Sequence, residues 1–110
     1  MKQYVVDEIR AADHEKIKVY LDAEFGPAEM GGLYWIPIAA EMLSEVQKAH
    51  QSCQPFFFAL DLEPDRLSCE LLIRTRGRIR CDCINYATEF QRNWLISVVD
   101  AVFEKLEIHT

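Results

Sequence analysis

Two neighbouring segments with alternating apolar residues constrain the fold of this chain most strongly. Residues 56–62 and 67–75 both alternate in this way, and Glu63-Pro64-Asp65-Arg66 separates them. Pairing Leu62 with Leu67 in an antiparallel hairpin brings the apolar positions onto one face, whereas a slip by one residue would divide them between two faces. The shared face consists of Phe56, Phe58, Leu60, Leu62, Leu67, Cys69, Leu71 and Ile73. The pattern therefore predicts a hairpin with one buried face and a defined register.

A third strand is predicted over residues 79–84, after a turn around Gly77. A three-residue loop would place Ile73 opposite Cys81 and Leu71 opposite Cys83. In that register Cys69, Cys81 and Cys83 would all face the core.

Two helices are predicted on the N-terminal side of the hairpin. Asp13 can cap a helix over residues 14–24, which Gly26-Pro27 would end. Apolar residues at helical spacing predict a second helix over residues 39–51. Between them, Leu33-Tyr34-Trp35-Ile36 has the composition of a strand that ends at Pro37, and its apolar faces predict cover on both sides.

A long helix is predicted at the C-terminal end. Thr88 and Gln91 form a capping-box pattern that opens it, and it would extend to about Leu106. Its apolar positions cover roughly two-thirds of the circumference, more than one sheet face requires. We therefore expect it to contact a second element, which could be another helix or a second subunit. The pattern is equally compatible with a homodimer and a monomer.

These elements follow the order α-β-α-β-β-β-α and indicate an α+β fold. We expect an antiparallel sheet of about four strands in a single layer, covered by three helices. Tyr4-Val5-Val6 is too short to assign. With no repeat or linker-like stretch, residues 1–110 are expected to form one domain.

Composition and charge exclude several classes of function. The longest apolar runs are far shorter than the roughly 20 residues that cross a bilayer, so no membrane association is expected. Acidic residues interrupt the N-terminal segment before an export signal could form, so we expect a cytoplasmic protein with reduced thiols. A net charge of −6 argues against nucleic acid as a partner.

Arginines form the leading candidate site. Residues 66–92 carry a local net charge of +3 although the chain is acidic. In the predicted register Arg74 and Arg80 face each other on the outer side of the sheet, where like charges repel. Because the guanidinium group suits carboxylates and phosphates, we expect an acidic protein or a small anionic ligand as partner. The candidate residues are Arg74, Arg76, Arg78, Arg80 and Arg92. The alternative is an exposed edge kept soluble by charge.

Arg92 belongs to this set because it falls within the apolar arc of the last helix, near its N-terminus. A partly buried arginine there would need an acidic partner. An apolar outer patch is also expected, formed by Phe57, Leu72 and Ile84 with Tyr34 or Trp35.

The cysteines define an alternative hypothesis, in which His50, Cys53, Cys81 and Cys83 bind zinc. Three thiolates and an imidazole form a recognised tetrahedral set. Their spacing is not a standard one, and Cys81 and Cys83 could share a metal only if their strand bends or ends there. Otherwise they are small buried apolar residues, and no cofactor is expected.

The sequence therefore favours a non-enzymatic interaction domain. No paired carboxylates, nucleotide-binding glycine loop or nucleophile elbow is present. A nucleophile pairing of Cys53 with His50 is possible at their spacing, but nothing in the sequence marks an oxyanion hole.

Overall fold

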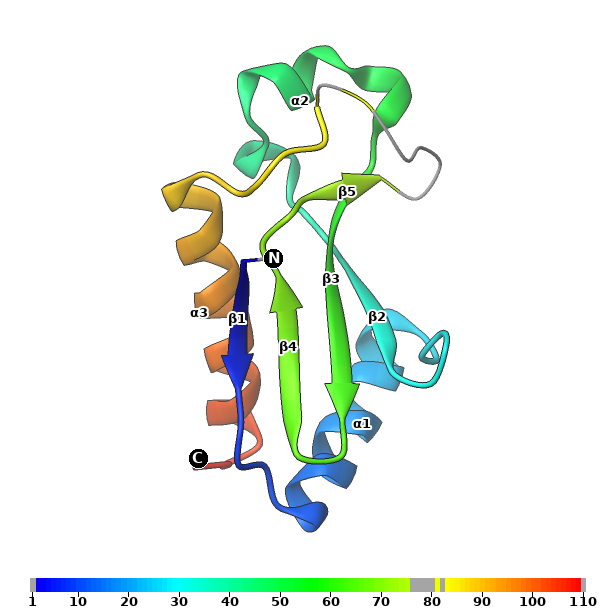
Figure 1. Cartoon of the computed structure of the whole chain (residues 1–110), viewed down its shortest axis with the longest axis vertical. Helices are drawn as coiled ribbons and strands as arrows, with labels where there is room; N and C mark the ends of the chain where they lie inside the picture. The colour runs from blue at the N-terminus through cyan, green and yellow to red at the C-terminus, as the bar shows by residue number, and fades with distance from the viewer. Residues whose placement is uncertain (1, 76–80, 82, 110) are drawn as a thin grey trace.

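The four long strands pair antiparallel in the order β1-β4-β3-β2, and a short fifth strand also pairs with β3 (Figure 1). This computed structural model describes residues 2–75, 81 and 83–109. The strands are β1 (Gln3–Val6), β2 (Leu33–Pro37), β3 (Phe56–Glu63), β4 (Arg66–Glu70) and β5 (Arg74–Thr75). The helices are α1 (Ala11–Phe25), α2 (Glu45–Ala49) and α3 (Glu89–Lys105), with the 3₁₀ turns η1 (Ala40–Met42) and η2 (Gln51–Cys53). The fold is α+β with the order β-α-β-α-β-β-β-α.

One row of residues across the sheet shows how the helices are held. Tyr4 of β1, Cys69 of β4, Leu60 of β3 and Tyr34 of β2 are successive cross-strand partners on one face. At the two ends of this row, the Tyr4 hydroxyl donates to Asp100 of α3 and the Tyr34 hydroxyl donates to Asp22 of α1, each at 2.6 Å. Both helices therefore lie on the same face of the sheet, behind it in Figure 1.

The predicted single-layer α+β architecture is confirmed, although not every helix lies on the sheet. Helix α2 and its flanking 3₁₀ turns lie beyond the sheet's upper end in Figure 1. The predicted cover on both faces of β2 is wrong for the described residues, because Leu33 and Trp35 on its outer face are only half-buried. Strand β1 is an addition to the predicted order, formed by the segment that is too short to assign from its sequence.

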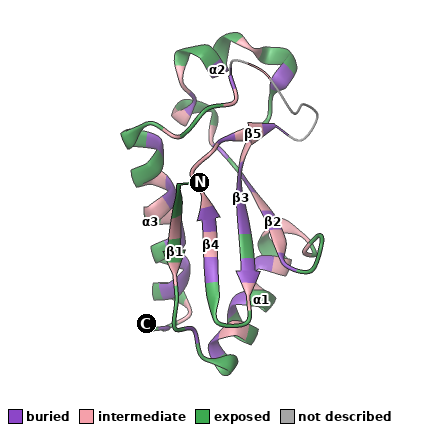
Figure 2. Ribbon diagram, viewed as in Figure 1, coloured by how far each residue is buried: buried purple, intermediate pink, exposed green. Residues whose placement is uncertain are grey.

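The central hairpin has its predicted register, with Leu62 opposite Leu67. Buried residues alternate with less buried ones along β4, whereas β3 also buries Ala59 between Phe58 and Leu60 (Figure 2). The predicted strand over residues 67–75 is interrupted, however. The Leu60–Cys69 pair and the Phe57–Arg74 pair are three residues apart along β3 but five residues apart along the segment from β4 to β5. Because the offset is an even two residues, Ile73 and Thr75 remain buried after the break.

The interruption reflects a different pairing from the one predicted. Leu72 bridges Tyr86, the Ile73 N–H donates to the Asn85 carbonyl, and the Ala87 N–H donates to the Leu71 carbonyl. The predicted pairs of Ile73 with Cys81 and Leu71 with Cys83 are therefore wrong. Cys81, Cys83 and Ile84 are not in a strand. Residues 76–80 and 82, including the rest of the predicted third strand, lie outside the described residues.

The helix predicted over residues 39–51 forms as three short pieces, namely η1, α2 and η2. Ser44 begins α2 with a capping box, in which Gln47 N–H donates to Ser44 Oγ and Ser44 N–H donates to Gln47 Oε1. A residue at an N-cap has extended backbone and cannot lie inside a helix. The local cap therefore overrides the helical spacing of the apolar residues.

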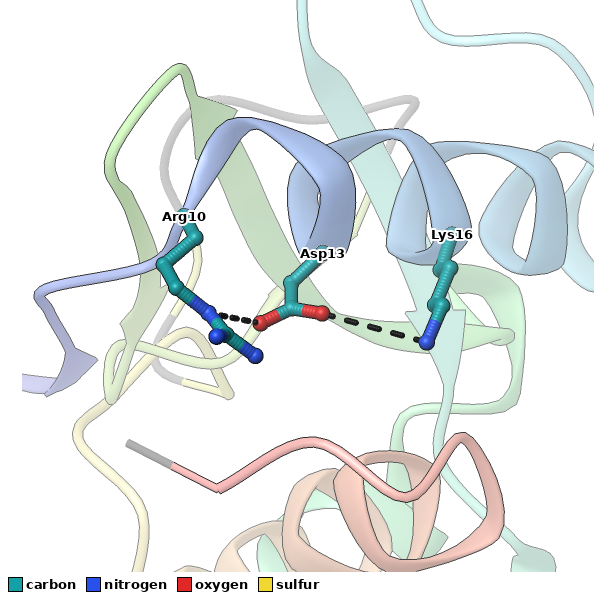
Figure 3. Close-up of polar contacts among 3 residues, drawn as sticks. All are labelled: Arg10, Asp13 and Lys16. Atoms are coloured by element: carbon teal, nitrogen blue, oxygen red, sulfur yellow. Dashed lines mark hydrogen bonds and ion pairs between the residues drawn. The ribbon is translucent and has the colours of Figure 1, made fainter.

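Asp13 is not the cap of the first helix, as predicted, but lies within its first turn. Helix α1 begins at Ala11, with Arg10 at the N-cap. The Asp13 carboxylate is 3% exposed, and it pairs with Arg10 Nε at 3.1 Å and Lys16 Nζ at 3.9 Å (Figure 3). A carboxylate here interacts favourably with the positive end of the helix dipole.

Helix α3 begins with the predicted Thr88–Gln91 capping box. It buries Leu95, Val99 and Phe103 in the core that also contains Ile17 and Leu21 of α1, and Val102 is buried as well. Helix α3 also has α1 as a neighbour, because Lys105 Nζ lies 5.2 Å from the centroid of the Tyr20 ring, and a second helix was one of the two predicted alternatives. Among the described residues, no helix is long and apolar enough to span a bilayer.

Candidate metal centre

His50 and Cys53 are brought to one side of the chain by η2. Helix α2 ends at Ala49 with His50 as its C-cap, and the Cys53 N–H then donates to the His50 carbonyl at 3.0 Å. A 3₁₀ turn has three residues per turn, so side chains three positions apart lie above one another. The local fold therefore presents an imidazole and a thiol together.

Cys81 and Cys83 come from the segment that leads into α3. The Ile84 N–H donates to the Cys81 carbonyl at 3.0 Å, which closes a turn over these residues. This turn meets the condition that the sequence raised, because the two cysteines are not held in a straight strand. Cys83 is buried and Cys81 is half-buried.

The structure brings His50, Cys53, Cys81 and Cys83 together as one Cys/His cluster. Their donor atoms all lie within 4.8 Å of one another. His50 Nδ1 is 3.1 Å from Cys81 Sγ, and Cys53 Sγ is 3.7 Å from Cys81 Sγ. The imidazole of His50 therefore contacts the thiol of Cys81, whereas the nucleophile pair considered from the sequence would require a contact with Cys53.

These distances suit a tetrahedral ion after small side-chain movements. Two sulfurs bound to one zinc lie about 3.8 Å apart, given a Zn–S bond of about 2.3 Å, and the Cys53–Cys81 separation is close to this. Four atoms within 4.8 Å of one another share a point no more than about 2.9 Å from each. The donors would therefore need to move inward by less than about 1 Å to reach zinc bond lengths.

The protonation of the cluster is uneven. The backbone N–H and thiol of Cys83, with smaller contributions from Cys53 and His50, stabilise the Cys81 thiolate and lower its pKa to about 6. Burial, followed by the hydrogen bond to Cys81, raises the pKa of Cys83 to about 12. The cluster therefore carries a thiolate at neutral pH and retains a proton on Cys83 that a metal ion must displace.

A buried pair of glutamines attaches α2 to α3. Gln91 Nε2 donates to Gln47 Oε1 and to the Met42 carbonyl, each at 2.9 Å. Each glutamine is also the third helical residue of its own helix and completes that helix's capping box, so the two boxes are joined directly. The box at Ser44-x-x-Gln47 was not predicted, although it has the same sequence signature as the predicted Thr88-x-x-Gln91.

The candidate anion site is only partly within the described structure. Arg74 pairs with Glu70 through contacts of 3.2 and 3.3 Å, so an acid within the fold already neutralises it. Arg92 is exposed, with a weak contact to Asn93 at 3.4 Å, so its predicted burial is wrong. Arg76, Arg78 and Arg80 lie outside the described residues. Binding of an acidic or anionic partner remains a prediction, as does the homodimer.

Of the predicted outer apolar patch, the structure brings together Trp35 and Phe57, whereas Ile84 packs against the core. Tyr34 is buried on the helix side of the sheet, whereas Trp35 contacts Phe57. Phe57, Leu72 and Ile84 are half-buried.

Compared with known proteins, the chain matches no family model, no curated protein and no solved structure. The functional assignment therefore depends on the geometry of the chain itself.

Proposed function

We propose that this chain is a zinc-binding domain in which His50, Cys53, Cys81 and Cys83 hold one structural zinc ion. The observation that carries the proposal is the convergence of one imidazole and three thiols within 4.8 Å, from segments 28 residues apart at Cys53 and Cys81. Sulfur and nitrogen are the donors that zinc prefers, and four of them complete a tetrahedron. A complete protein ligand set favours a structural role, since a catalytic zinc keeps an open position.

The packing around the cluster gives the ion a stabilising role. Within residues 40–53, the buried residues are Leu43, Gln47 and Cys53, and only Leu43 and Cys53 of these belong to the apolar core. An ion bound to His50 and Cys53 on one side and to Cys81 and Cys83 on the other would cross-link these segments. Metal binding to a site absent from the unfolded chain adds directly to folding stability.

Native mass spectrometry of protein purified without chelator tests the proposal first. We expect a mass increment of one zinc per chain, which is lost on denaturation. Replacing zinc by cobalt should give the visible absorption of tetrahedral cobalt and an intense thiolate charge-transfer band. Free zinc at about 100 times its Kd should stabilise the domain by about 2.7 kcal/mol.

Cysteine variants separate metal binding from packing. Cys53→Ser and Cys81→Ser should each abolish the cobalt charge-transfer spectrum or weaken binding severely. Cys69→Ser is the matched control, because Cys69 is buried in the sheet row with Tyr4 and outside the cluster. A Cys69→Ser protein that keeps its metal while the other two lose it supports the site. If the folded wild-type protein takes up no zinc or cobalt when one equivalent or more is added, the proposed zinc site is refuted.

A further inference from the structure

Strand β1 is an edge strand of the sheet, with β4 as its partner on one side (Figure 1). The Leu71 N–H donates to the Lys2 carbonyl, which extends this pairing by one residue in the same register. In an antiparallel pair, the backbone groups of successive residues point alternately to the two sides of a strand. The even-numbered residues of β1 therefore direct theirs at β4, whereas Gln3 and Val5 direct theirs away from the sheet.

The outward side of β1 is open to a further strand. Among the described residues, no hydrogen bond uses the outward backbone groups of Gln3 or Val5. Proteins commonly protect such an edge with lysine, proline or a bulge, but the residues of β1 are Gln-Tyr-Val-Val in regular pairing. Val5 is 42% exposed. This edge can therefore form main-chain hydrogen bonds with an extended peptide, which is the mode of binding called strand addition.

A cavity of about 550 Å³ lies beside β1, on the side of the sheet that the helices cover. Tyr4 and Val6 form one wall, and the C-terminal half of α3 with the residues after it forms the other. The side chains of an added strand would alternate between the two faces, as those of β1 do. Every second side chain of a bound peptide would therefore lie over this cavity. The cavity shares no residue with the Cys/His cluster, so it is independent of the proposed zinc site.

Carboxylates determine which side chains suit the cavity. Its ionisable lining, apart from the tyrosine, consists of exposed Asp100, Glu104, Glu107 and His109. Asp100 accepts the hydrogen bond from Tyr4, whereas the described part of the chain offers no ion-pair partner to either glutamate. Lys105 does not neutralise them, because its Nζ lies over the Tyr20 ring of α1. The cavity therefore favours a positively charged side chain.

We propose that the edge of β1 binds an extended peptide with lysine or arginine at alternate positions. The main chain of the peptide would bond to Gln3 and Val5 and supply affinity, while its alternate side chains would supply specificity. The basic side chains would extend along Tyr4 and Val6 and place their charged ends at the carboxylates of α3. The intervening side chains would lie beside Val5, where β-branched apolar residues fit best.

Nuclear magnetic resonance of the ¹⁵N-labelled full chain tests the proposal, with a blocked hexapeptide of alternating lysine and valine as the probe. We expect saturable shifts of the Gln3 and Val5 amide signals, and slower hydrogen exchange at both amides. A peptide with three lysines followed by three valines has the same charge but cannot place all its lysines on one face. It should bind at least about fivefold more weakly. N-methylation of the valines removes the donors that would face β1 and should weaken binding by about fivefold for each hydrogen bond lost.

Variants locate the binding at this edge. Val5→Pro removes the outward N–H and no bond to β4, so it should weaken binding at least about fivefold. Circular dichroism would confirm that this variant is folded, and the N-methylated peptide tests the same bond in the wild-type chain. Glu104→Gln with Glu107→Gln should weaken binding by about twofold to thirtyfold. Glu15→Gln with Glu24→Gln is the matched control, because both are exposed on α1, outside the cavity, and the change in net charge is identical.

Three results would overturn the proposal. Equal binding of the alternating and the block peptide would mean that the protein attracts positive charge without forming a strand. Unchanged binding of the N-methylated peptide would likewise exclude main-chain pairing. The third result is the absence of saturable shifts at Gln3 and Val5, including the case of a dimer that Val5→Pro dissociates, since a second copy of the chain would then occupy the edge.

Discussion

Replacing Gln91 by glutamate would test whether the polar link between α2 and α3 determines the stability of the region around the cluster. Gln91 is 2% exposed, and its Oε1 accepts from the Thr88 N–H at 3.0 Å. Glutamate preserves the shape and this acceptor, so the capping box can remain. It lacks the Nε2 donors, however, and would direct a carboxylate oxygen at the Met42 carbonyl and Gln47 Oε1.

The expected cost follows from these contacts. Two hydrogen bonds are lost at about 1 kcal/mol each, and the buried oxygen without donors costs a further 1–3 kcal/mol or so. We therefore expect the free energy of unfolding to fall by about 3–5 kcal/mol near neutral pH. Burial should raise the pKa of the introduced carboxyl above that of an unfolded glutamate, about 4.3. The protonated form can still donate one hydrogen bond, so the loss should be smallest in acid and should grow as pH rises through the folded-state pKa.

Urea denaturation followed by circular dichroism at pH 5 and pH 8 would measure this loss, with wild type in the same buffer at each pH. Gln51→Glu is the control, since Gln51 is exposed and the change in charge is identical. This control should change stability by no more than about 0.5 kcal/mol. If Gln91→Glu is no more destabilising than Gln51→Glu, or its effect is independent of pH, the reasoning fails. Weaker zinc binding by the Gln91 variant would be a second expected result.

Three further predictions concern single sites. Gly32→Ala would place a methyl group against the Leu62 carbonyl, which cannot retreat without loosening its strand, and should lower stability by about 1–3 kcal/mol in thermal unfolding; an unchanged melting temperature would contradict this. The hydrogen bond to Asp100 raises the pKa of Tyr4 to about 12, so its stabilising contribution should be complete below pH 10 and lost as pH rises through 12. Tyr4→Phe should flatten the alkaline part of the stability profile, and a profile identical to wild type would exclude this role. Zinc affinity should rise with pH by about tenfold per unit for each proton released, with Cys83 supplying at least one. Calorimetry in buffers of different ionisation enthalpy would count the protons, and a count of zero would contradict the proposed ligand set.

The parts of the fold that the sequence predicted correctly depend on local patterns. Leu62 faces Leu67 because any odd slip would expose the apolar face of β3, and α3 begins at its capping box because Thr88 and Gln91 satisfy each other's backbone donors. Such patterns are complete within a few residues, so their outcome can be worked out without the rest of the chain.

The errors occur where a distant segment competes with the local pattern. Leu71 and Ile73 continue the alternation of β4 as a longer strand would, but the segment around Tyr86 pairs with this stretch instead. The helix expected over residues 39–51 is divided because Gln47 serves a cap at Ser44 and a bond to Gln91. Hydrophobic periodicity contains no information about such partners.

By itself, the sequence determined the central hairpin, the long final helix and the inventory of candidate zinc ligands, because side-chain chemistry and local periodicity are properties of short segments. The tertiary structure decided which of those side chains meet. Cys69 is buried in the sheet, where β4 still pairs with β3. After this point residues 71–73 bond to residues 85–87 instead, and Cys81 and Cys83 lie next to His50 and Cys53. The Cys/His cluster is formed by contacts between distant segments, and these form only when the whole core packs.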